Sequence, residues 1–268
     1  KKTDHRVYLY LGAVNYDAKV YLNGTKVGEH IGGYTPFNME VTNQIKDGEN
    51  FVVVKVDNKR TAEGVPTLNC DWFNFGGITR DVMLVEVPQT YISSYYVQLK
   101  KGSKDTLTGY VKMDGAVASH KVQLEIPGLK IKKELTTDTK GYASFEIKAK
   151  PILWSTENPY LYQVSLSTDT DKVTDEIGFR TIETKGRQIL LNGNPVFLKG
   201  ISIHEEAPFR SGRICSEEED LTLLNWAKEL GCNYVRLAHY PHNEKMVRLA
   251  EKMGLMVWSE IPVYWTIQ

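Results

Sequence analysis

The feature that most constrains the fold is a change in hydrophobic pattern after Thr181. Beyond that residue, the largely apolar run Val196–Ile201 is typical of a strand buried on both faces of a parallel sheet. Two helical segments and two more short strands, Asn233–Leu237 and Leu255–Trp258, then alternate along the chain. This strand-helix-strand-helix-strand order predicts a right-handed unit of parallel strands with helices packed against the sheet.

Both predicted helices carry start and stop signals. Ser216 opens the first helix, because Glu219 three residues later completes a capping box, and Gly231 ends it. The second helix begins at about Asn243 and stops at Gly254. Each helix has one predicted apolar face, made of Leu223, Leu224, Ala227 and Leu230 in the first and of Met246, Leu249, Ala250 and Met253 in the second.

The chain before Thr181 shows only β patterns. Residues 1–88 contain alternating or apolar runs separated by turns, and Asn23-Gly24 gives a two-residue hairpin signal because both residues tolerate a positive φ. This region is typical of a jelly-roll segment, whose first strands can lie upstream of Lys1. Residues 89–181 contain six or seven short strands at regular spacing, as in an immunoglobulin-like sandwich. With residues 182–268 as the parallel α/β segment, the sequence predicts three domains and a mainly β fold.

Composition limits the classes of function. The 33 basic and 33 acidic residues balance, which gives no electrostatic reason to expect a nucleic acid or an anionic membrane as partner. No apolar run reaches about 18 residues, so no membrane span is expected, and no apolar leader follows Lys1. The three cysteines, Cys70, Cys215 and Cys232, are widely spaced and predict neither a disulfide framework nor a zinc site.

Polar residues follow all three predicted parallel strands. They are Ser202–Glu206 after the first strand, Ala238–His242 after the second and Ser259–Pro262 after the third. Ligands of parallel α/β folds meet the carboxyl ends of the strands. Histidines and carboxylates that converge on one rim are suited to binding sugar hydroxyls or to acid/base chemistry. Exposed loops are also polar without any function, so each residue taken alone fits both interpretations.

At these motifs the chain resembles glycoside hydrolase family 2. The runs Phe197–Glu205, Val235–Pro241 and Val257–Glu260 are similar to the opening of the family's catalytic TIM barrel. Upstream, Val20–Phe37 and Gly76–Val82 are similar to its sugar-binding jelly roll. The resemblance covers essentially the whole chain, in the family's order of jelly roll, immunoglobulin-like domain and barrel. It implies that residues 182–268 form the N-terminal part of a TIM-barrel catalytic domain.

The resemblance implies four substrate-binding residues. Asp71 matches an aspartate that reaches from the jelly roll into the active site and binds substrate hydroxyls. A carboxylate is suited to this role because it accepts charge-assisted hydrogen bonds from two adjacent hydroxyls. His204 and His239 match histidines that line the same pocket, and Glu260 matches an acid on a barrel strand. On residue type alone, Asp71 also fits an ordinary turn on a loop.

In some members of the family, the acid at the position of Glu260 helps to hold a magnesium ion, with a histidine two residues later as its partner. Pro262 stands at that position in this chain. This departure counts against a magnesium site, and no cofactor is expected.

Other polar and aromatic residues fit structural roles. Arg236 suits a buried ion pair as well as a substrate ligand, and Trp258 is expected to pack in the core. Tyr34 and Trp72 could stack on a sugar or lie in a sandwich core. The acidic run Glu217–Asp220 lies at a predicted helix start, where negative charge complements the helix dipole.

The resemblance also implies where the catalytic acids lie. A retaining glycosidase needs two carboxyl groups about 5–5.5 Å apart, one as acid/base and one as nucleophile. In family 2 they follow the fourth and seventh barrel strands, whereas this sequence reaches Gln268 after the third predicted strand. Glu205, Glu206 and Glu260 follow other strands, so no catalytic residue is assigned in this chain. We therefore expect a fragment that is inactive alone and has an open sheet edge.

The leading interpretation is a retaining exo-β-glycosidase that acts on terminal β-linked sugars, with a β-galactosidase as first choice. A β-glucuronidase is the alternative, because the segments around Asp71 and His204 lean toward that type and Arg210 and Arg213 could pair with a uronic acid carboxylate. A non-catalytic carbohydrate-binding protein is a third interpretation, but it leaves the presence of the barrel segment unexplained.

The expected partner is an oligosaccharide or glycoside. A homo-oligomer is compatible with the sequence, and periplasmic or secreted localisation is suspected because such enzymes are often exported.

Overall fold

The chain forms two units, and the computed structural model describes residues 4–115 and 118–263. The first unit combines residues 1–86, 199–250 and 255–268. The second combines residues 87–198 with residues 251–254. The segment predicted as a jelly roll therefore shares a unit with the three predicted parallel strands.

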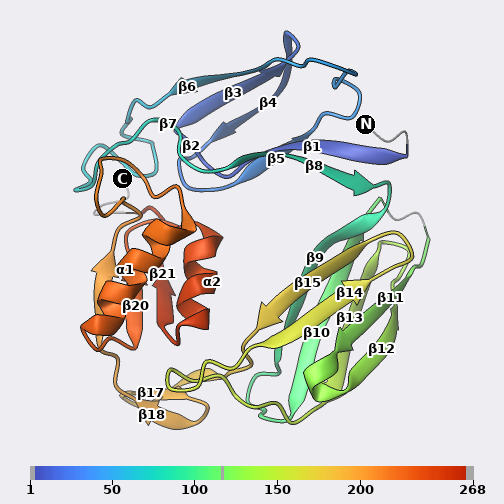
Figure 1. Ribbon diagram of the computed structural model, residues 1–268, viewed down its shortest axis with the longest axis vertical. Helices are drawn as coiled ribbons and strands as arrows, with labels where there is room; N and C mark the ends of the chain where they lie inside the picture. The colour runs from blue at the N-terminus through green and yellow to red at the C-terminus, as the bar shows by residue number, and fades with distance from the viewer. Residues whose placement is uncertain (1–3, 116–117, 264–268) are drawn as a thin grey trace. The chain divides into compact units, whose positions relative to one another are not determined.

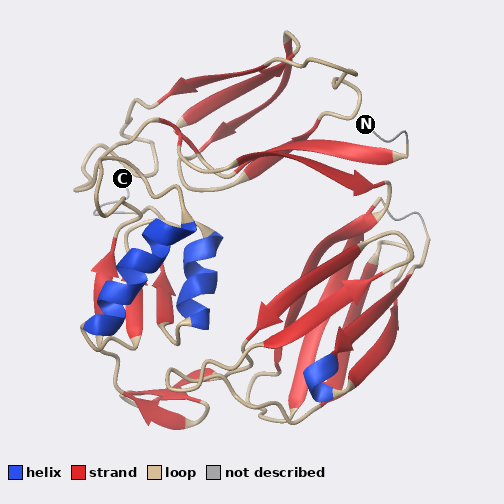
Figure 2. Cartoon of the chain, in the orientation of Figure 1, coloured by secondary structure: helices blue, strands red, loops and turns tan. Residues whose placement is uncertain are grey.

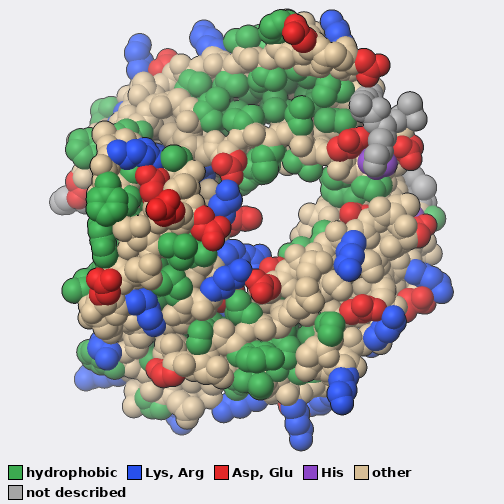
Figure 3. All heavy atoms as spheres, viewed as in Figure 1, with side chains coloured by type: hydrophobic (Ala, Val, Ile, Leu, Met, Phe, Trp, Pro, Cys, Tyr) green, Lys and Arg blue, Asp and Glu red, His purple; other side chains and the backbone are tan. Residues whose placement is uncertain are grey.

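Two small sheets make up the N-terminal part of the first unit (Figure 1). One has the order β5-β1-β8 and the other the order β4-β3-β6, with a short β2-β7 pair beside them. Their bounds are β1 His5–Leu11, β2 Val14–Asn15, β3 Asp17–Leu22, β4 Thr25–Ile31, β5 Phe37–Glu40, β6 Val52–Asp57, β7 Gly77–Ile78 and β8 Val82–Pro88. Hydrophobic side chains gather between the two sheets in the upper part of the view (Figure 3).

Alternation of apolar residues explains this packing. In β1, the buried residues are Val7, Leu9 and Leu11, and in β3 they are Ala18, Val20 and Leu22, so each strand turns one face to the shared core. The hairpin predicted at Asn23-Gly24 is confirmed, since these residues join β3 to β4 with φ values of 52° and 83°.

The three parallel strands are present as predicted. They are β19 Gly200–Ile203, β20 Tyr234–Leu237 and β21 Met256–Ser259, paired in that order in parallel. The helices α1 Glu217–Glu229 and α2 Glu244–Lys252 connect them and lie together in front of the sheet (Figure 2). The Ser216 side chain accepts a hydrogen bond from the Glu219 amide, which confirms the predicted start of the first helix.

Three predicted details of this region are wrong. The strand expected at Val196–Ile201 is split: β18 ends at Val196 in an antiparallel hairpin, and Phe197, 81% exposed, precedes the start of β19. Leu230 is 70% exposed because it lies at the C-cap, past the buried stripe of α1. Trp258 is 56% exposed and shares a sheet face with Arg236, whose guanidinium lies 5.9 Å from the indole centroid.

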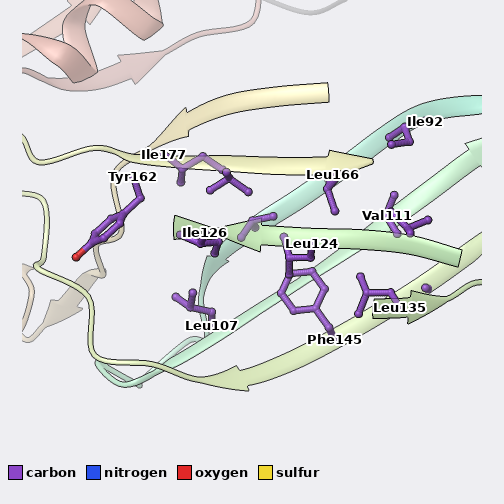
Figure 4. Packing of buried hydrophobic residues seen from close by; sticks show 14 of the residues in the cluster. Ile92, Leu107, Val111, Leu124, Ile126, Leu135, Phe145, Tyr162, Leu166 and Ile177 are labelled. Atoms are coloured by element: carbon purple, nitrogen blue, oxygen red, sulfur yellow. The ribbon is translucent and has the colours of Figure 1, made fainter. Parts of the chain in front are cut away.

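The second unit contains a two-sheet sandwich. One sheet has the order β13-β10-β9 and the other the order β12-β11-β14-β15. Their bounds are β9 Tyr91–Leu99, β10 Thr106–Asp114, β11 Lys121–Ile126, β12 Ile131–Thr136, β13 Tyr142–Lys148, β14 Tyr162–Ser167 and β15 Lys172–Ile177, with a 3-10 turn at Pro127–Leu129. Figure 4 shows apolar side chains from both sheets, among them Val111, Leu124 and Phe145, directed into one core. A separate meander, β16 Ile182–Lys185, β17 Gln188–Leu191 and β18 Asn194–Val196, also belongs to this unit.

The predicted fold class is confirmed: a mainly β chain with two sandwich-like segments followed by parallel strands and helices of barrel type. The borders at residues 88 and 181 stay predictions. Neither α1 nor α2, the α-helices of the described ranges, is long and apolar enough to cross a membrane.

The sandwich of the second unit depends on close packing at Gly109 in β10. A Cβ atom there would clash with the carbonyl oxygen of Tyr96 and would lie 2.6 Å from Cζ of Phe145. We expect Gly109→Ala to lower the free energy of unfolding by about 3 kcal/mol, because backbone and ring must both move. Urea denaturation measures this. Lys112→Ala, at an exposed position of the same strand, is the control and should change stability by less than about 0.5 kcal/mol; equal losses for both variants would contradict the packing argument.

Candidate active site

The structure brings the four predicted sugar-binding residues together within the first unit. His204, His239 and Glu260 follow β19, β20 and β21, at the carboxyl ends of the parallel strands. The rings of His204 and His239 lie 5.2 Å apart, and Nδ1 of His239 lies 3.2 Å from Oε2 of Glu260. Asp71 is exposed on the loop before β7, and its charge acts on the pKa of His204. His204, His239 and Glu260 therefore form one cluster, and Asp71 lies within electrostatic range of it.

Glu260 is held in an ion pair. Arg236 donates from Nε to Oε1 at 2.7 Å and from Nη2 to Oε2 at 3.0 Å, a bidentate arrangement. Burial alone would raise the pKa of Glu260, but Arg236 and then His239 outweigh it, so the pKa is lowered. Of the two roles expected for Arg236, the structure shows the ion pair. A carboxyl group with a lowered pKa is ionised at neutral pH and is not a proton donor.

His204 is half-buried and neutral at neutral pH. Burial lowers its pKa, and the positive charge on Arg213 and the neighbouring His239 act in the same direction. The charges of Glu206 and Asp71 oppose the shift without reversing it. Its Nδ1 atom lies 3.2 Å from the hydroxyl of Tyr240. A neutral imidazole has one donor and one acceptor nitrogen, so it is suited to bind a hydroxyl group.

An aromatic cluster of Tyr34, Trp72 and Tyr240 lies beneath the two histidines. All three side chains are buried. Tyr34 and Tyr240 are stacked with centroids 4.2 Å apart, and Trp72 donates from Nε1 to the Tyr34 hydroxyl at 2.7 Å. The indole of Trp72 lies 6.3 Å from the ring of His204 and 5.6 Å from that of His239. Tyr34 and Trp72 are therefore core residues that support the histidines, and they do not form an open stacking surface for a sugar.

Arg213 is buried against this cluster, with 7% of its surface exposed. Its guanidinium lies 4.4 Å from the ring centroid of Tyr240 and 5.2 Å from that of Tyr34. It donates to both hydroxyl groups, from Nη1 to Tyr240 and from Nη2 to Tyr34, the latter at 3.0 Å. Cation–π contacts and hydrogen bonds to phenols hold this charge in a site where a carboxylate would be the usual partner.

The loops that carry the site are tied together by a second buried arginine. Arg80, before β8, forms a salt bridge of 2.7 Å with Glu205, whose surface is only 2% exposed. Arg80 also donates to the carbonyl oxygens of Tyr34 at 3.0 Å and Pro241 at 2.6 Å. Oε1 of Glu205 accepts a further hydrogen bond from the Asn243 amide at 2.8 Å. One ion pair thus links the segment before β8 to the loops after β19 and β20.

The hypothesis that Arg210 and Arg213 bind a uronic acid carboxylate does not fit this geometry. Arg213 is buried among the aromatic rings. Arg210 donates to both oxygens of Glu219, at 2.8 Å and 2.7 Å, and to Sγ of Cys215 at 2.9 Å. Both guanidinium groups are already engaged within the chain. Sequence reasoning missed the roles of Tyr240 and Arg80, which no local motif distinguishes from core and surface residues.

The residues around Glu260 do not fit a magnesium ion. Magnesium prefers oxygen ligands in octahedral geometry, whereas the Glu260 oxygens bind the guanidinium of Arg236 and approach His239. Pro262 adds no ligand. Among residues 4–115 and 118–263, no group of three or more histidine, cysteine, aspartate or glutamate side chains is placed to hold a metal ion.

Two buried titratable groups lie beside the site. Asp220, in the first turn of α1, is 2% exposed and its Oδ1 has no hydrogen-bond partner; burial, followed by the charge of Glu205, raises its pKa to about 7. His242 approaches the Ala238 carbonyl oxygen through Nε2 at 2.9 Å, and burial lowers its pKa to about 4. The two shifts have opposite effects on stability between pH 4 and 6.5.

Three family descriptions match successive parts of the chain. Residues 1–88 match "Glycosyl hydrolases family 2, sugar binding domain", and residues 90–180 match "Glycosyl hydrolases family 2". Residues 182–265 match "Glycosyl hydrolases family 2, TIM barrel domain". The three matches leave only a few residues of the sequence uncovered.

Relatives and solved structures agree with these matches. The chain is 34% identical over 95% of its length to a protein of Formosa agariphila provisionally named a β-glucuronidase, and 32% identical over 96% to a β-galactosidase of Thermoanaerobacter pseudethanolicus. Its structure matches the β-glucuronidase of Bifidobacterium dentium complexed with coumarin-3-O-glucuronide, with a TM-score of 0.89, 25% identity and 97% of this chain covered. The chain spans 32%, 37% and 50% of the length of these three proteins, respectively.

We expect a strong loss of stability when the Arg80–Glu205 ion pair is broken. Arg80→Met should lower the free energy of unfolding by about 3–5 kcal/mol, because it leaves the Glu205 carboxylate buried without its cation. The double variant Arg80→Met/Glu205→Leu should recover about 2 kcal/mol of that loss, since no charge is then left buried. Urea denaturation measures each value.

The control for this prediction is an exposed ion pair of the same unit. Lys245 lies 2.6 Å from Asp81, with the two side chains 54% and 47% exposed. Lys245→Met should change stability by less than about 1 kcal/mol, because solvent screens such pairs. A loss for Arg80→Met as small as that for Lys245→Met would show that Glu205 is not held as described.

Asp220 predicts a change in the pH dependence of stability. Between pH 4 and 7 its folded carboxyl keeps a proton that the unfolded chain releases, so stability falls as pH rises. His242 has the opposite slope between pH 4 and 6.5, because the folded ring is neutral while the unfolded ring is protonated. Asp220→Asn should leave only the rising slope over that interval and should add about 2 kcal/mol at pH 8.

Urea titrations from pH 4 to pH 8 test this. Glu218→Gln, an exposed carboxylate in the same helical turn, is the matched control and should leave the pH profile unchanged. An Asp220→Asn variant that is less stable than the wild type at pH 8 would contradict a raised pKa for Asp220.

Proposed function

Because the chain belongs to glycoside hydrolase family 2, we propose that it forms the substrate-binding side of a retaining exo-β-glycosidase that acts on β-glucuronides. The cluster of Asp71, His204, His239 and Glu260 is the observation that carries the proposal. Its residues come from the jelly-roll loop and from all three strand ends of the barrel segment, the face of a barrel at which active sites are built.

The chemistry of the cluster suits a sugar ring. The exposed carboxylate of Asp71 accepts hydrogen bonds from hydroxyl groups, and the neutral His204 has one donor and one acceptor nitrogen to offer. Arg236 and Glu260 neutralise each other, so the pair adds no net charge to the site. Arrays of fixed hydrogen-bonding groups of this kind orient a polyhydroxyl ligand.

Relatives favour glucuronides over galactosides, which reverses the first choice made from the sequence. Both the first relative and the solved structure with TM-score 0.89 carry β-glucuronidase names, and further β-glucuronidases, including those of Streptococcus agalactiae and Bacteroides fragilis, are 30% and 32% identical to the chain. A β-galactosidase at 32% identity keeps the galactoside as the second candidate. Since Arg210 and Arg213 are engaged elsewhere, the uronate carboxylate needs other partners.

Neither of the two strand-end carboxylates held in ion pairs is suited to catalysis. Glu205 is held by Arg80 and Glu260 by Arg236, so neither is poised as a nucleophile or a proton donor. The acid/base and nucleophile expected after the fourth and seventh barrel strands have no counterpart among the described residues. We therefore expect the 268-residue chain alone to bind sugar without turnover.

Hydrolysis of 4-nitrophenyl β-D-glucuronide and β-D-galactoside tests the proposal, with the 268-residue chain assayed beside any longer natural form that contains it. The longer form should prefer the glucuronide, and the chain alone should be inactive. In the longer form, Asp71→Asn should lower kcat/KM about 100-fold, because a charged acceptor for substrate hydroxyls is lost. Asp81→Asn is the control. It removes an exposed carboxylate that pairs with Lys245 and should change kcat/KM less than about threefold.

Each outcome has a clear meaning. If the longer form prefers the galactoside, the proposed substrate class changes to β-galactosides and the proposed sugar-binding site stays the same. Turnover by the 268-residue chain at a comparable rate would show that the catalytic acids lie within it. Binding of D-glucuronic acid by every form without any turnover would support a carbohydrate-binding protein instead of an enzyme.

A further inference from the structure

We propose that Arg213 and Tyr240 act as positioning residues that fix His204 in one tautomer, with the proton on Nε2, so that His204 presents a hydrogen-bond donor to the bound sugar. The tautomer follows from the hydrogen bonds within the chain, and its use on a sugar rests on the proposed function. The donors and acceptors around the hydroxyls of Tyr34 and Tyr240 determine the tautomer.

Arg213 can only donate hydrogen bonds. A guanidinium carries five N–H groups and no acceptor, so its contacts with the hydroxyls of Tyr240 and Tyr34 are both donated by Arg213. Each phenol oxygen therefore has one acceptor position occupied by Arg213. The buried position of Arg213, 7% exposed, leaves little room for water to replace it.

The hydroxyl of Tyr34 fixes the orientation of the Arg213 guanidinium. The Tyr34 hydroxyl accepts from Trp72 Nε1 at 2.7 Å as well as from Arg213 Nη2 at 3.0 Å. The indole nitrogen is also only a donor. Both acceptor positions of the Tyr34 oxygen are therefore used, which anchors one end of the guanidinium and directs the other end at Tyr240.

The proton of the hydrogen bond between Tyr240 and His204 belongs to the Tyr240 hydroxyl. The Tyr240 oxygen accepts from Arg213, and its own O–H proton needs an acceptor within the buried cluster. Nδ1 of His204, at 3.2 Å, is the acceptor that the structure provides. An Nδ1 that accepts carries no proton, so the neutral ring has its proton on Nε2.

The surrounding charges keep the ring neutral. Arg213 and His239 disfavour the charged ring, while Glu206 and Asp71 favour it, and burial decides in favour of the neutral form. Nε2 lies on the opposite side of the imidazole from Nδ1, so it is directed away from Tyr240. His204 then offers a neutral N–H donor to a sugar hydroxyl or carboxylate oxygen, and Asp71, whose charge reaches His204, offers an acceptor carboxylate.

The experiment is long-range ¹H–¹⁵N NMR of the histidine rings in the ligand-free chain at pH 7.5. His204 should show the Nε2-protonated pattern, with one pyridine-type nitrogen at Nδ1. Tyr240→Phe keeps the ring and removes the hydroxyl, so it should produce a mixture of tautomers and raise the pKa of His204. Arg213→Met should also admit the Nδ1-protonated form, because the Tyr240 oxygen can then accept from the ring.

Two controls separate positioning from general disturbance. Tyr34→Phe removes one anchor of Arg213 and no hydrogen bond of His204 itself, so it should shift the His204 tautomer less than Tyr240→Phe does. His242 serves as an internal reference, since its Nε2 approaches the Ala238 carbonyl oxygen, which none of the substitutions removes. If Arg213→Met does not fold, the comparison of Tyr240→Phe with Tyr34→Phe still decides.

Several results would overturn the proposal: an Nδ1-protonated, mixed or charged His204 in the wild type, or equal effects of Tyr240→Phe and Tyr34→Phe. Because the spectra are recorded without substrate, they do not depend on the proposed function. Absence of glucuronide turnover in every form, with the expected spectra, would count against the proposed function and leave the tautomer assignment intact.

Discussion

The buried ion pair between Arg80 and Glu205 is the interaction on which the site depends. It links the segment before β8 to the loop after β19, and the two further bonds of Arg80 reach Tyr34 and Pro241. In a low-dielectric interior these charge-assisted bonds are directional, and a missing partner is costly. We infer that the pair specifies where the loops meet more than it adds to net stability. The aromatic cluster and the two histidines lie where these loops converge.

A common principle governs the charges around the site. The guanidinium groups of Arg80 and Arg236 are matched to carboxylates, and Arg213 is matched to phenol hydroxyls and aromatic rings. His204 is kept neutral by burial. What remains for a ligand is hydrogen-bonding capacity with little net charge, together with the exposed carboxylate of Asp71. This suits the recognition of hydroxyl groups, in which direction matters more than charge.

The sequence predicted the features that arise from local patterns. The helix start at Ser216, the turn at Asn23-Gly24 and the order of the parallel strands all follow from residue spacing, and all three are confirmed. The capping box is only half formed, because the Glu219 carboxylate accepts from the Cys215 amide and from Arg210. His204, His239 and Glu260 could be selected because motif resemblance and the strand-end rule pointed to the same positions, whereas Asp71 was selected by the resemblance alone. Their role in sugar binding stays a proposal.

The remaining features depend on contacts between distant segments, which no local pattern contains. Arg213 was considered as a partner of a uronic acid carboxylate, yet it is buried between Tyr34 and Tyr240, which lie far from it in sequence. Asp220 was expected to complement a helix dipole, yet burial raises its pKa to about 7. Trp258 was expected in a core, but the face of the sheet that it shares with Arg236 leaves it exposed.

The measurement that tests the central claim most directly is chemical-shift mapping of the chain during titration with D-glucuronic acid, with D-galactose titrated in parallel. The account predicts that the largest shifts occur at the amides of Asp71, His204 and His239, and that glucuronic acid gives them at lower concentration than galactose. Shifts confined to other residues, or no shifts at these three amides with either sugar, would contradict the assignment of this cluster as the sugar-binding site.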